Sequence, residues 1–181
     1  MSPAAMRQIS SSTAHRNPWF TVERRQYETA SGTRLPYFMV CRPDSVLVAP
    51  RQDGRYVLVE LDRPTMGGAR SLEFPQGGLS GDEQPEAAAR REVREETGLE
   101  LTGVRHLATF AESNGFATSS CHAFVADVSG AGAPDRDPFE AGMDIRRFSW
   151  PQLRELVAAG AVRDSATLAA LAVMGASGDA G

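Results

Sequence analysis

The chain has 181 residues and a formal net charge of −4, with hydrophobic residues at 41% of positions and charged residues at 23%. This length and composition fit one globular domain with a substantial core, and the acidic balance does not favour a general nucleic-acid-binding surface. The sequence contains no lysine, so lysine Schiff-base chemistry is excluded. Any phosphate group must therefore be held by guanidinium or backbone N–H groups.

The cysteines and the apolar runs indicate the cellular compartment of the protein. Cys41 and Cys121 are too few and too far apart for a zinc motif or a disulfide framework, and each lies in an apolar run that predicts a buried free thiol. No apolar run reaches the length of a membrane span, and the N-terminus lacks the apolar segment of a secretory signal. We therefore expect a cytoplasmic protein that does not bind a membrane.

The N-terminal part of the chain differs in character from the rest. Residues 1–16 are polar and unpatterned, which predicts disorder. Residues 19–27 and 35–41 then have the composition of strands. We expect a disordered N-terminus over residues 1–16 and a small strand segment over residues 17–42.

Residues 43–174 are expected to form the main domain. Apolar runs predict strands at residues 45–49, 55–61, 71–74, 104–111, 120–128 and 145–150. Helices are expected from Pro151 to about residue 158, and from a cap at Asp164 or Ser165 to about residue 174. A flexible tail is expected over residues 175–181. Strands interleaved with helices indicate an α/β or α+β domain.

The stretch from Gly77 to Leu99 combines a glycine turn with a short helix. Gly77 and Gly78 can take positive φ and let another group approach the backbone closely. Pro85 suits the first helical position, and Gly98 can end the helix in a left-handed cap. The stretch is therefore predicted to be a tight glycine loop followed by a short helix.

Three carboxylates lie on one face of this predicted helix. Glu92, Glu95 and Glu96 are spaced i, i+3 and i+4, and like charges so placed destabilise a bare helix. A hard divalent cation would reverse that penalty, and Mg²⁺ prefers oxygen ligands. The acidic face therefore predicts a metal site, and the alternative is a solvated, charge-rich helix.

This stretch resembles the signature sequence of the Nudix hydrolases, G-x5-E-x7-R-E-U-x-E-E-x-G-U, where U is a bulky aliphatic residue. Every fixed position is matched, by Gly77, Glu83, Arg91, Glu92, Val93, Glu95, Glu96, Gly98 and Leu99. The resemblance implies a Nudix fold, in which a mixed β-sheet lies between helices and a small N-terminal β extension precedes it. It also implies metal-dependent hydrolysis of the pyrophosphate bond of a nucleoside diphosphate derivative.

The resemblance assigns roles to residues of the stretch. Glu92 and Glu96 are the leading ligands for Mg²⁺, or alternatively Mn²⁺, with Glu95 as the third. The backbone carbonyl of Gln76 would add a ligand. Arg91 with Glu83 would brace the loop against the helix, a role hard to separate from catalysis, or would form a simple ion pair.

The resemblance to the pyrophosphatase branch implies that the general base lies in the loop following the late strand, beyond the signature stretch. That loop offers Asp135, Asp137, Glu140 and Asp144. Glu140 is the first choice and Asp144 the second. The alternative is that these are solvated loop carboxylates and that Glu95 takes the proton.

The N-terminal strands resemble the small extra domain of the ADP-ribose pyrophosphatase branch, in which similar segments support a homodimer. Arg63 resembles an arginine that meets substrate phosphate in that branch, and Glu73 with Phe74 matches an acidic–apolar pair before the loop. Phe116 is a candidate for stacking on the base. The alternatives are a surface arginine and a core aromatic residue. The predicted reaction is hydrolysis of an ADP-sugar such as ADP-ribose to AMP and a sugar phosphate.

Two features depart from that branch. Asn114 stands where the branch has proline, and Ser119 lies near the place of a missing acidic residue. Separately, residues 74–78 read FPQGG, like Nudix enzymes that act on dinucleoside polyphosphates and RNA 5′ ends. A hydrolase of such nucleotides is therefore one alternative. A non-catalytic nucleotide-sensing module is another, although sensors usually lose the box carboxylates that are retained here.

Overall fold

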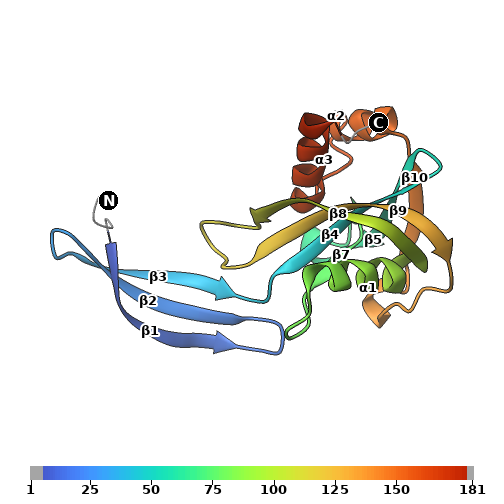
Figure 1. The fold of residues 1–181 in the computed structure, drawn as a ribbon. Coiled ribbons are helices and arrows are strands. Elements are labelled where there is room, and N and C mark those ends of the chain that lie inside the picture. Colours follow the sequence, from blue (N-terminus) through green and yellow to red (C-terminus); the bar gives the residue numbers. More distant parts are fainter. Residues whose placement is uncertain (1–5, 179–181) are drawn as a thin grey trace. The chain divides into compact units, whose positions relative to one another are not determined.

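The computed structural model describes residues 6–178, and the chain divides into two compact units (Figure 1). The first unit runs to Pro43 and includes Ala111–Ser120, and the second comprises Asp44–Phe110 and the chain from Cys121 onward. The sequence did not predict that residues 111–120 join the N-terminal segment. They do so through backbone hydrogen bonds on Val40, which donates to the Phe116 carbonyl and accepts from the Thr118 N–H.

The first unit contains a three-stranded antiparallel sheet of β1 (Met6–Arg16), β2 (Thr21–Thr29) and β3 (Arg34–Cys41). The prediction of disorder is wrong for residues 6–16, because β1 pairs with β2 from end to end. Backbone hydrogen bonds hold this strand and do not require apolar side chains. Residues 1–5, to which the same prediction applied, lie outside the described residues.

The strand β3 exposes large apolar side chains on consecutive positions. Tyr37 and Phe38 are 42% and 52% exposed, and Leu35 is 45% exposed. Neighbouring side chains of a strand point to opposite faces, so both faces of this strand are open. The described part of the first unit contains no helix that could cover them.

The second unit is built on a mixed sheet of seven strands within the described residues. The strands are β4 (Ser45–Gln52), β5 (Arg55–Asp62), β6 (Arg70–Glu73), β7 (Gln76–Gly78), β8 (Leu99–Ala111), β9 (Ser120–Ala131) and β10 (Asp144–Phe148). Their order is β10-β5-β4-β9-β8, with β6 beside β5 and β7 beside β4. The sheet is mixed because β4 runs parallel to β9 and antiparallel to β7.

Helices cover both faces of this sheet. They are α1 (Pro85–Thr97), α2 (Trp150–Ala158) and α3 (Ser165–Ser177), and two 3₁₀ turns, η1 (Pro64–Met66) and η2 (Pro138–Glu140), lie in loops. Alternate residues of β4 face opposite ways: Leu47 packs in the core cluster that includes Leu153 and Met174 of α2 and α3, whereas Val46 packs in the cluster that includes Val93 of α1. The predicted α/β arrangement of a mixed sheet between helices is confirmed.

Some elements are longer than the sequence predicted. The strand β8 starts at Leu99, directly after the cap of α1, and α3 reaches Ser177. The predicted tail is therefore wrong for residues 175–177, because the helix ends only at Gly178, which takes a left-handed φ of 79°. Residues 179–181 lie outside the described residues.

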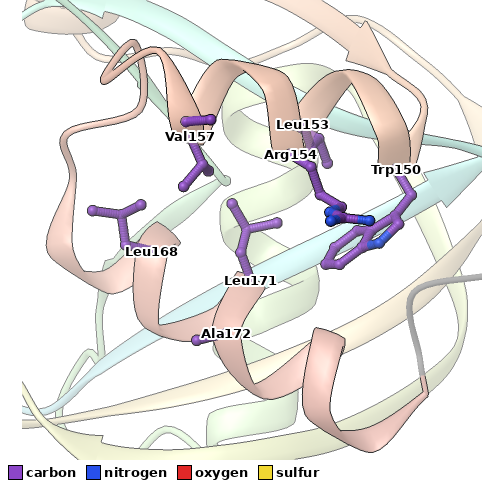
Figure 2. Close-up of a pocket in the computed structure, with 8 residues that line it drawn as sticks. Trp150, Leu153, Arg154, Val157, Leu168, Leu171 and Ala172 are labelled. Atoms are coloured by element: carbon purple, nitrogen blue, oxygen red, sulfur yellow. The ribbon is translucent and has the colours of Figure 1, made fainter.

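An apolar hollow of about 290 Å³ lies between α2 and α3 (Figure 2). Trp150 and Leu153 line it from α2, and Leu168 and Leu171 line it from α3.

No helix within residues 6–178 is long and apolar enough to cross a membrane.

Candidate active site

The helix α1 adopts the conformation predicted from the sequence, whereas the predicted glycine loop is wrong for Gly77 and Gly78, which belong to the short strand β7 and do not take positive φ. Gly77 of β7 pairs with Val46 of the buried strand β4, which fixes the turn to the sheet. Pro85 is the first residue of α1, and Gly98 caps the helix with φ 72° while its N–H donates to the Arg94 carbonyl at 2.8 Å.

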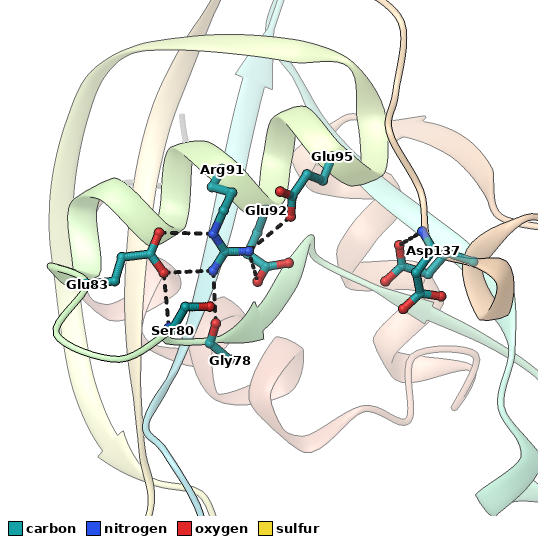
Figure 3. Close-up of polar contacts among 8 residues, drawn as sticks. Gly78, Ser80, Glu83, Arg91, Glu92, Glu95 and Asp137 are labelled. Atoms are coloured by element: carbon teal, nitrogen blue, oxygen red, sulfur yellow. Dashed lines mark hydrogen bonds and ion pairs between the residues drawn. The ribbon is translucent and has the colours of Figure 1, made fainter. Parts of the chain in front are cut away.

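Arg91 links this turn to the helix (Figure 3). Its Nε and Nη2 donate to the two carboxylate oxygens of Glu83 at 2.9 and 2.8 Å, and Nη2 also donates to the Gly78 carbonyl at 3.0 Å. Its Nη1 donates to Glu92 at 2.7 Å and to Glu95 at 3.0 Å. These contacts engage all five N–H donors of the guanidinium group. The hydrogen bonds from Arg91 hold the pKa of Glu83 below its usual value.

Glu92 and Glu96 are buried acids, with exposed fractions of 9% and 3%. Burial raises the pKa of Glu92 and raises that of Glu96 well above its usual value, and Glu140 adds to both effects. The backbone of Gln76 acts in the opposite direction and lowers the pKa of Glu96. The Glu96 Oε2 atom is buried without a hydrogen-bond partner among the described residues.

These residues offer a donor set that fits a hard divalent cation, although the set is not fully gathered. Within residues 6–178, no three His, Cys, Asp or Glu side chains converge as a metal cluster. A buried carboxylate oxygen without a partner is costly, and a cation would satisfy it. The unpartnered oxygen of Glu96 therefore favours Glu92, Glu96 and the adjacent backbone of Gln76 as the ligands.

A polar pocket of about 530 Å³ opens beside this helix face. It is lined by Gln76, Gly77, Gly78, Arg91, Glu92, Glu95, Asp135, Arg136, Asp137 and Glu140. The acidic loop of residues 135–140 thus faces the signature stretch across one cavity. Burial, followed by the neighbouring Asp137, raises the pKa of Glu140.

The structure separates the two predicted general bases. Glu140 lines the pocket, at the end of η2, where Asp137 and Glu140 form a capping box. Asp144 lies on β10, is exposed, and accepts a hydrogen bond from Arg70 at 2.8 Å. That hydrogen bond lowers the pKa of Asp144. Among the described residues, the pocket lining does not include Asp144.

Arg63 is engaged by a buried acid rather than free at the pocket. Its Nε and Nη2 donate to Glu73 at 2.9 and 2.5 Å, and Gln76 Nε2 donates to Glu73 at 2.8 Å. Burial alone would raise the pKa of Glu73, but hydrogen bonds led by Arg63 hold it below its usual value. Within residues 6–178, the pocket lining includes neither member of this pair. Glu73 thus orients Arg63, and the contact of Arg63 with substrate phosphate stays a prediction.

Phe116 belongs to the first unit. It is 59% exposed, and its carbonyl accepts a hydrogen bond from the Val40 N–H at 2.9 Å. In the same unit, Ser119 is buried and donates a hydrogen bond to Glu112, which also accepts one from Arg42 at 3.1 Å.

Arg136 is a pocket residue that the sequence analysis missed. Its Nε donates to the Glu96 carbonyl and its Nη1 donates to the Met143 carbonyl, each at 2.7 Å. The only sequence signal was a lone basic residue between Asp135 and Asp137.

Comparison with known proteins identifies the family. A family model described as the NUDIX domain matches residues 42–171. The chain belongs to the Nudix family. It is a Nudix hydrolase that acts on pyrophosphate bonds of nucleotide derivatives, as the signature stretch implied.

Several curated proteins are similar to this Nudix hydrolase. A CMP-5'-(N-acetyl-N-hydroxy-3-aminopropyl)phosphonate hydrolase of Streptomyces rubellomurinus is 26% identical over 165 residues, covering 91% of this chain and 80% of that protein. A methanol dehydrogenase activator of Bacillus methanolicus is 30% identical over 149 residues, covering 80% and 78%. A GDP-mannose pyrophosphatase of Escherichia coli is 32% identical over 98 residues, covering 50% and 49%.

A solved structure supports the fold. The crystal structure of an ADP compounds hydrolase superposes with a TM-score of 0.84 at 21% identity, covering 96% of this chain and 94% of that one. The predicted Nudix fold is confirmed.

Proposed function

We propose that this Nudix hydrolase cleaves the pyrophosphate bond of an ADP-sugar such as ADP-ribose, giving AMP and a sugar phosphate. A water oxygen bonds to one phosphorus, the bond from that phosphorus to the bridging oxygen breaks, and the proton of the water passes to a protein base. The observation that carries the proposal is the cavity in which Glu92 and Glu95 of α1 face Glu140 of the acidic loop.

In this proposal Glu92, Glu96 and the Gln76 carbonyl hold Mg²⁺, or alternatively Mn²⁺, and Glu95 is a further ligand. When bound, the cation supplies charge that offsets the pyrophosphate and activates water for attack. The unpartnered oxygen of Glu96 and the burial of both acids support this ligand set. Arg91 keeps the helix face in register with the glycine turn.

Glu140 is the proposed general base. It lines the same pocket as the metal-binding helix face, and its raised pKa makes it a stronger proton acceptor than an ordinary carboxylate. Glu95 is the second candidate, but its carboxylate is already bound by Arg91. Asp144 is set aside because Arg70 binds it on β10.

The substrate class rests on resemblance rather than on a contact. The N-terminal strands resemble the ADP-ribose pyrophosphatase branch, whereas Asn114 and Ser119 depart from it. Similar proteins also include a pyrophosphatase of a nucleoside diphosphate sugar, GDP-mannose, and a hydrolase of ADP compounds. The FPQGG run of residues 74–78 favours dinucleoside polyphosphates instead.

A comparison of specificity constants tests the substrate. We expect kcat/KM to be higher for ADP-ribose than for diadenosine polyphosphates at one fixed Mg²⁺ concentration. A ratio well below one would assign the enzyme to polyphosphates and leave the hydrolase chemistry in place.

The first unit is proposed to form a homodimer contact. The exposed Leu35, Tyr37 and Phe38 on β3 would be buried by a second copy, and closed two-fold dimers are the commonest assembly. Light scattering should then report about twice the chain mass of 19.4 kDa. A monomer at all micromolar concentrations would contradict this.

A further inference from the structure

The acidic pocket has two arginines in its lining among the described residues, Arg91 and Arg136. Arg91 donates all five N–H groups to Glu83, Glu92, Glu95 and the Gly78 carbonyl. It therefore has no donor left for a substrate.

Two backbone carbonyls hold the Arg136 side chain in place, but they do not use all of its N–H groups. Nε donates to the Glu96 carbonyl in the last turn of α1, and Nη1 donates to the carbonyl of the buried Met143. The described residues leave the other N–H groups of Nη1 and Nη2 without an acceptor. Because two carbonyls already hold the guanidinium plane, binding an anion would cost little further side-chain entropy.

The loop that carries Arg136 is itself anchored to the end of α1. The Asp135 N–H donates to the Glu95 carbonyl at 2.9 Å, and the Gly132 N–H donates to the Gly98 carbonyl at 2.6 Å. These bonds satisfy carbonyls that the helix end leaves open. Arg136 is therefore held beside the pocket by its backbone as well as by its side chain.

The negative charge of the pocket means that a diphosphate needs a positively charged side chain to face it. Carboxylates dominate the lining, with Glu92 and Glu95 on one side and Asp135, Asp137 and Glu140 on the other. A nucleoside diphosphate entering the pocket would be repelled wherever a cation does not face it. Arg63, the arginine expected to meet phosphate, is bound by Glu73.

We propose that Arg136 binds the diphosphate of the substrate, donating its remaining N–H groups to phosphate oxygens. The inference rests on the proposed function, because it takes the acidic pocket as the place where the pyrophosphate is cleaved. Arg136 would act in addition to Arg63, which the resemblance assigns to substrate phosphate. A forked guanidinium suits this role because it can donate to phosphate and backbone oxygens at once.

Calorimetric titration with magnesium methylenediphosphonate, which cannot be hydrolysed at a P–O–P bond, tests the assignment directly. We expect Arg136→Gln to weaken its binding about ten- to a hundredfold, the loss of charge-assisted hydrogen bonds. Arg70→Gln is the matched control. Arg70 donates to the Gly142 carbonyl of the same loop at 3.2 Å but is not in the pocket lining, so we expect a change of less than about twofold. Wild-type affinity in Arg136→Gln, or an equal loss in Arg70→Gln, would overturn the proposal.

Two further measurements separate a binding role from a structural one. Mg²⁺ titrated alone should bind Arg136→Gln as it binds the wild type, and a parallel loss of Mg²⁺ affinity would overturn the proposal. If Arg136→Gln does not fold, Arg136→Lys takes its place. It keeps the charge but cannot hold both carbonyls and an anion, so a loss of about three- to tenfold is expected. Undiminished affinity in Arg136→Lys would contradict the assignment.

The outcome is independent of the nucleoside. If ADP-ribose is not hydrolysed but Arg136→Gln loses methylenediphosphonate affinity, the proposed substrate fails and the role of Arg136 stands. If ADP-ribose is hydrolysed and the affinity is unchanged, the proposed function stands and Arg136 is not the diphosphate ligand.

Discussion

The backbone of Gly77 lies directly against the carboxylate of Glu92. A Cβ atom at Gly77 would lie 2.2 Å from Glu92 Cδ and 2.2 and 2.3 Å from its two carboxylate oxygens. The φ of Gly77 is not in the left-handed region, so the requirement for glycine is steric rather than conformational. The first glycine of the signature stretch therefore allows a buried carboxylate to pack against the edge of β7.

Gly77→Ala should destabilise the protein through this contact. Glu92 is buried and bound by Arg91, so it cannot move aside freely. Overpacking of this kind costs about 1–3 kcal/mol, which corresponds to a fall in Tm of about 2–12 °C for a protein of this size. Gly78→Ala is the control, because a Cβ there meets nothing within 4 Å. Equal melting temperatures for Gly77→Ala and Gly78→Ala would show that the contact is not restrictive.

Metal-free protein should lose stability as the pH rises. Burial lifts the pKa of Glu92 and Glu96 above the ordinary value of 4.5, so the folded state binds these protons more tightly than the unfolded chain does. Stability therefore falls as the pH rises from the unfolded pKa through the higher folded pKa. Glu96→Gln removes one of the two ionisations. We therefore expect the Tm of Glu96→Gln minus the Tm of the wild type, both measured in EDTA, to increase from about pH 4 to about pH 8.

The control for this titration is Glu86→Gln. Glu86 lies in the first turn of α1, and 57% of its side chain is exposed beside Arg90. The difference in Tm between Glu86→Gln and the wild type should be nearly constant over the same pH range. A difference that grows with pH as much as that of Glu96→Gln would show that burial of Glu96 is not the cause.

Arg63→Met should reduce stability because it leaves the buried Glu73 without its main partner. Removing one member of a buried pair costs about 3–5 kcal/mol, and we expect about 2–4 kcal/mol here because Arg63 is partly exposed. Denaturant unfolding of Arg63→Met, Glu73→Gln and the double variant measures the coupling. A double variant less stable than Arg63→Met would contradict the pairing.

Glu140→Gln and Asp144→Asn should differ sharply in activity. Loss of a general base typically reduces kcat about 10²- to 10⁴-fold, and Glu140 is the proposed base in the pocket. Asp144 binds Arg70 on β10, so its amide variant should keep kcat within about threefold, the change expected from loss of an exposed ion pair. Steady-state kinetics on ADP-ribose would contradict the assignment if Asp144→Asn were the more impaired of the two.

The parts of the fold that follow local rules were predictable from the sequence. Pro85 and Gly98 set the two ends of α1 through backbone conformation alone, and the turn at Asp53-Gly54 adopts the positive φ values of 51° and 71° that such a hairpin requires. The three glutamates of α1 follow helical spacing. The shared face of these carboxylates could therefore be predicted before its surroundings were known.

The parts that depend on distant partners were not predictable. The strand β1 is polar and gains its order only by pairing with β2. The carboxylate of Glu73 is buried and needs a nearby positive charge. Arg63 supplies that charge through its hydrogen bonds to Glu73. Arg136 depends on the carbonyls of Glu96 and Met143, which no local pattern of residues 132–143 indicates.

The most direct test of the central claim is the turnover of ADP-ribose by Glu96→Gln at saturating Mg²⁺. Glu96 is the buried carboxylate whose Oε2 has no hydrogen-bond partner among the described residues, and the amide keeps its size while removing its charge. We predict a loss in kcat of at least about a hundredfold, as for removal of an electrostatic group that acts in the transition state. Turnover equal to that of the wild type would contradict the assignment of the α1 face as the catalytic metal site.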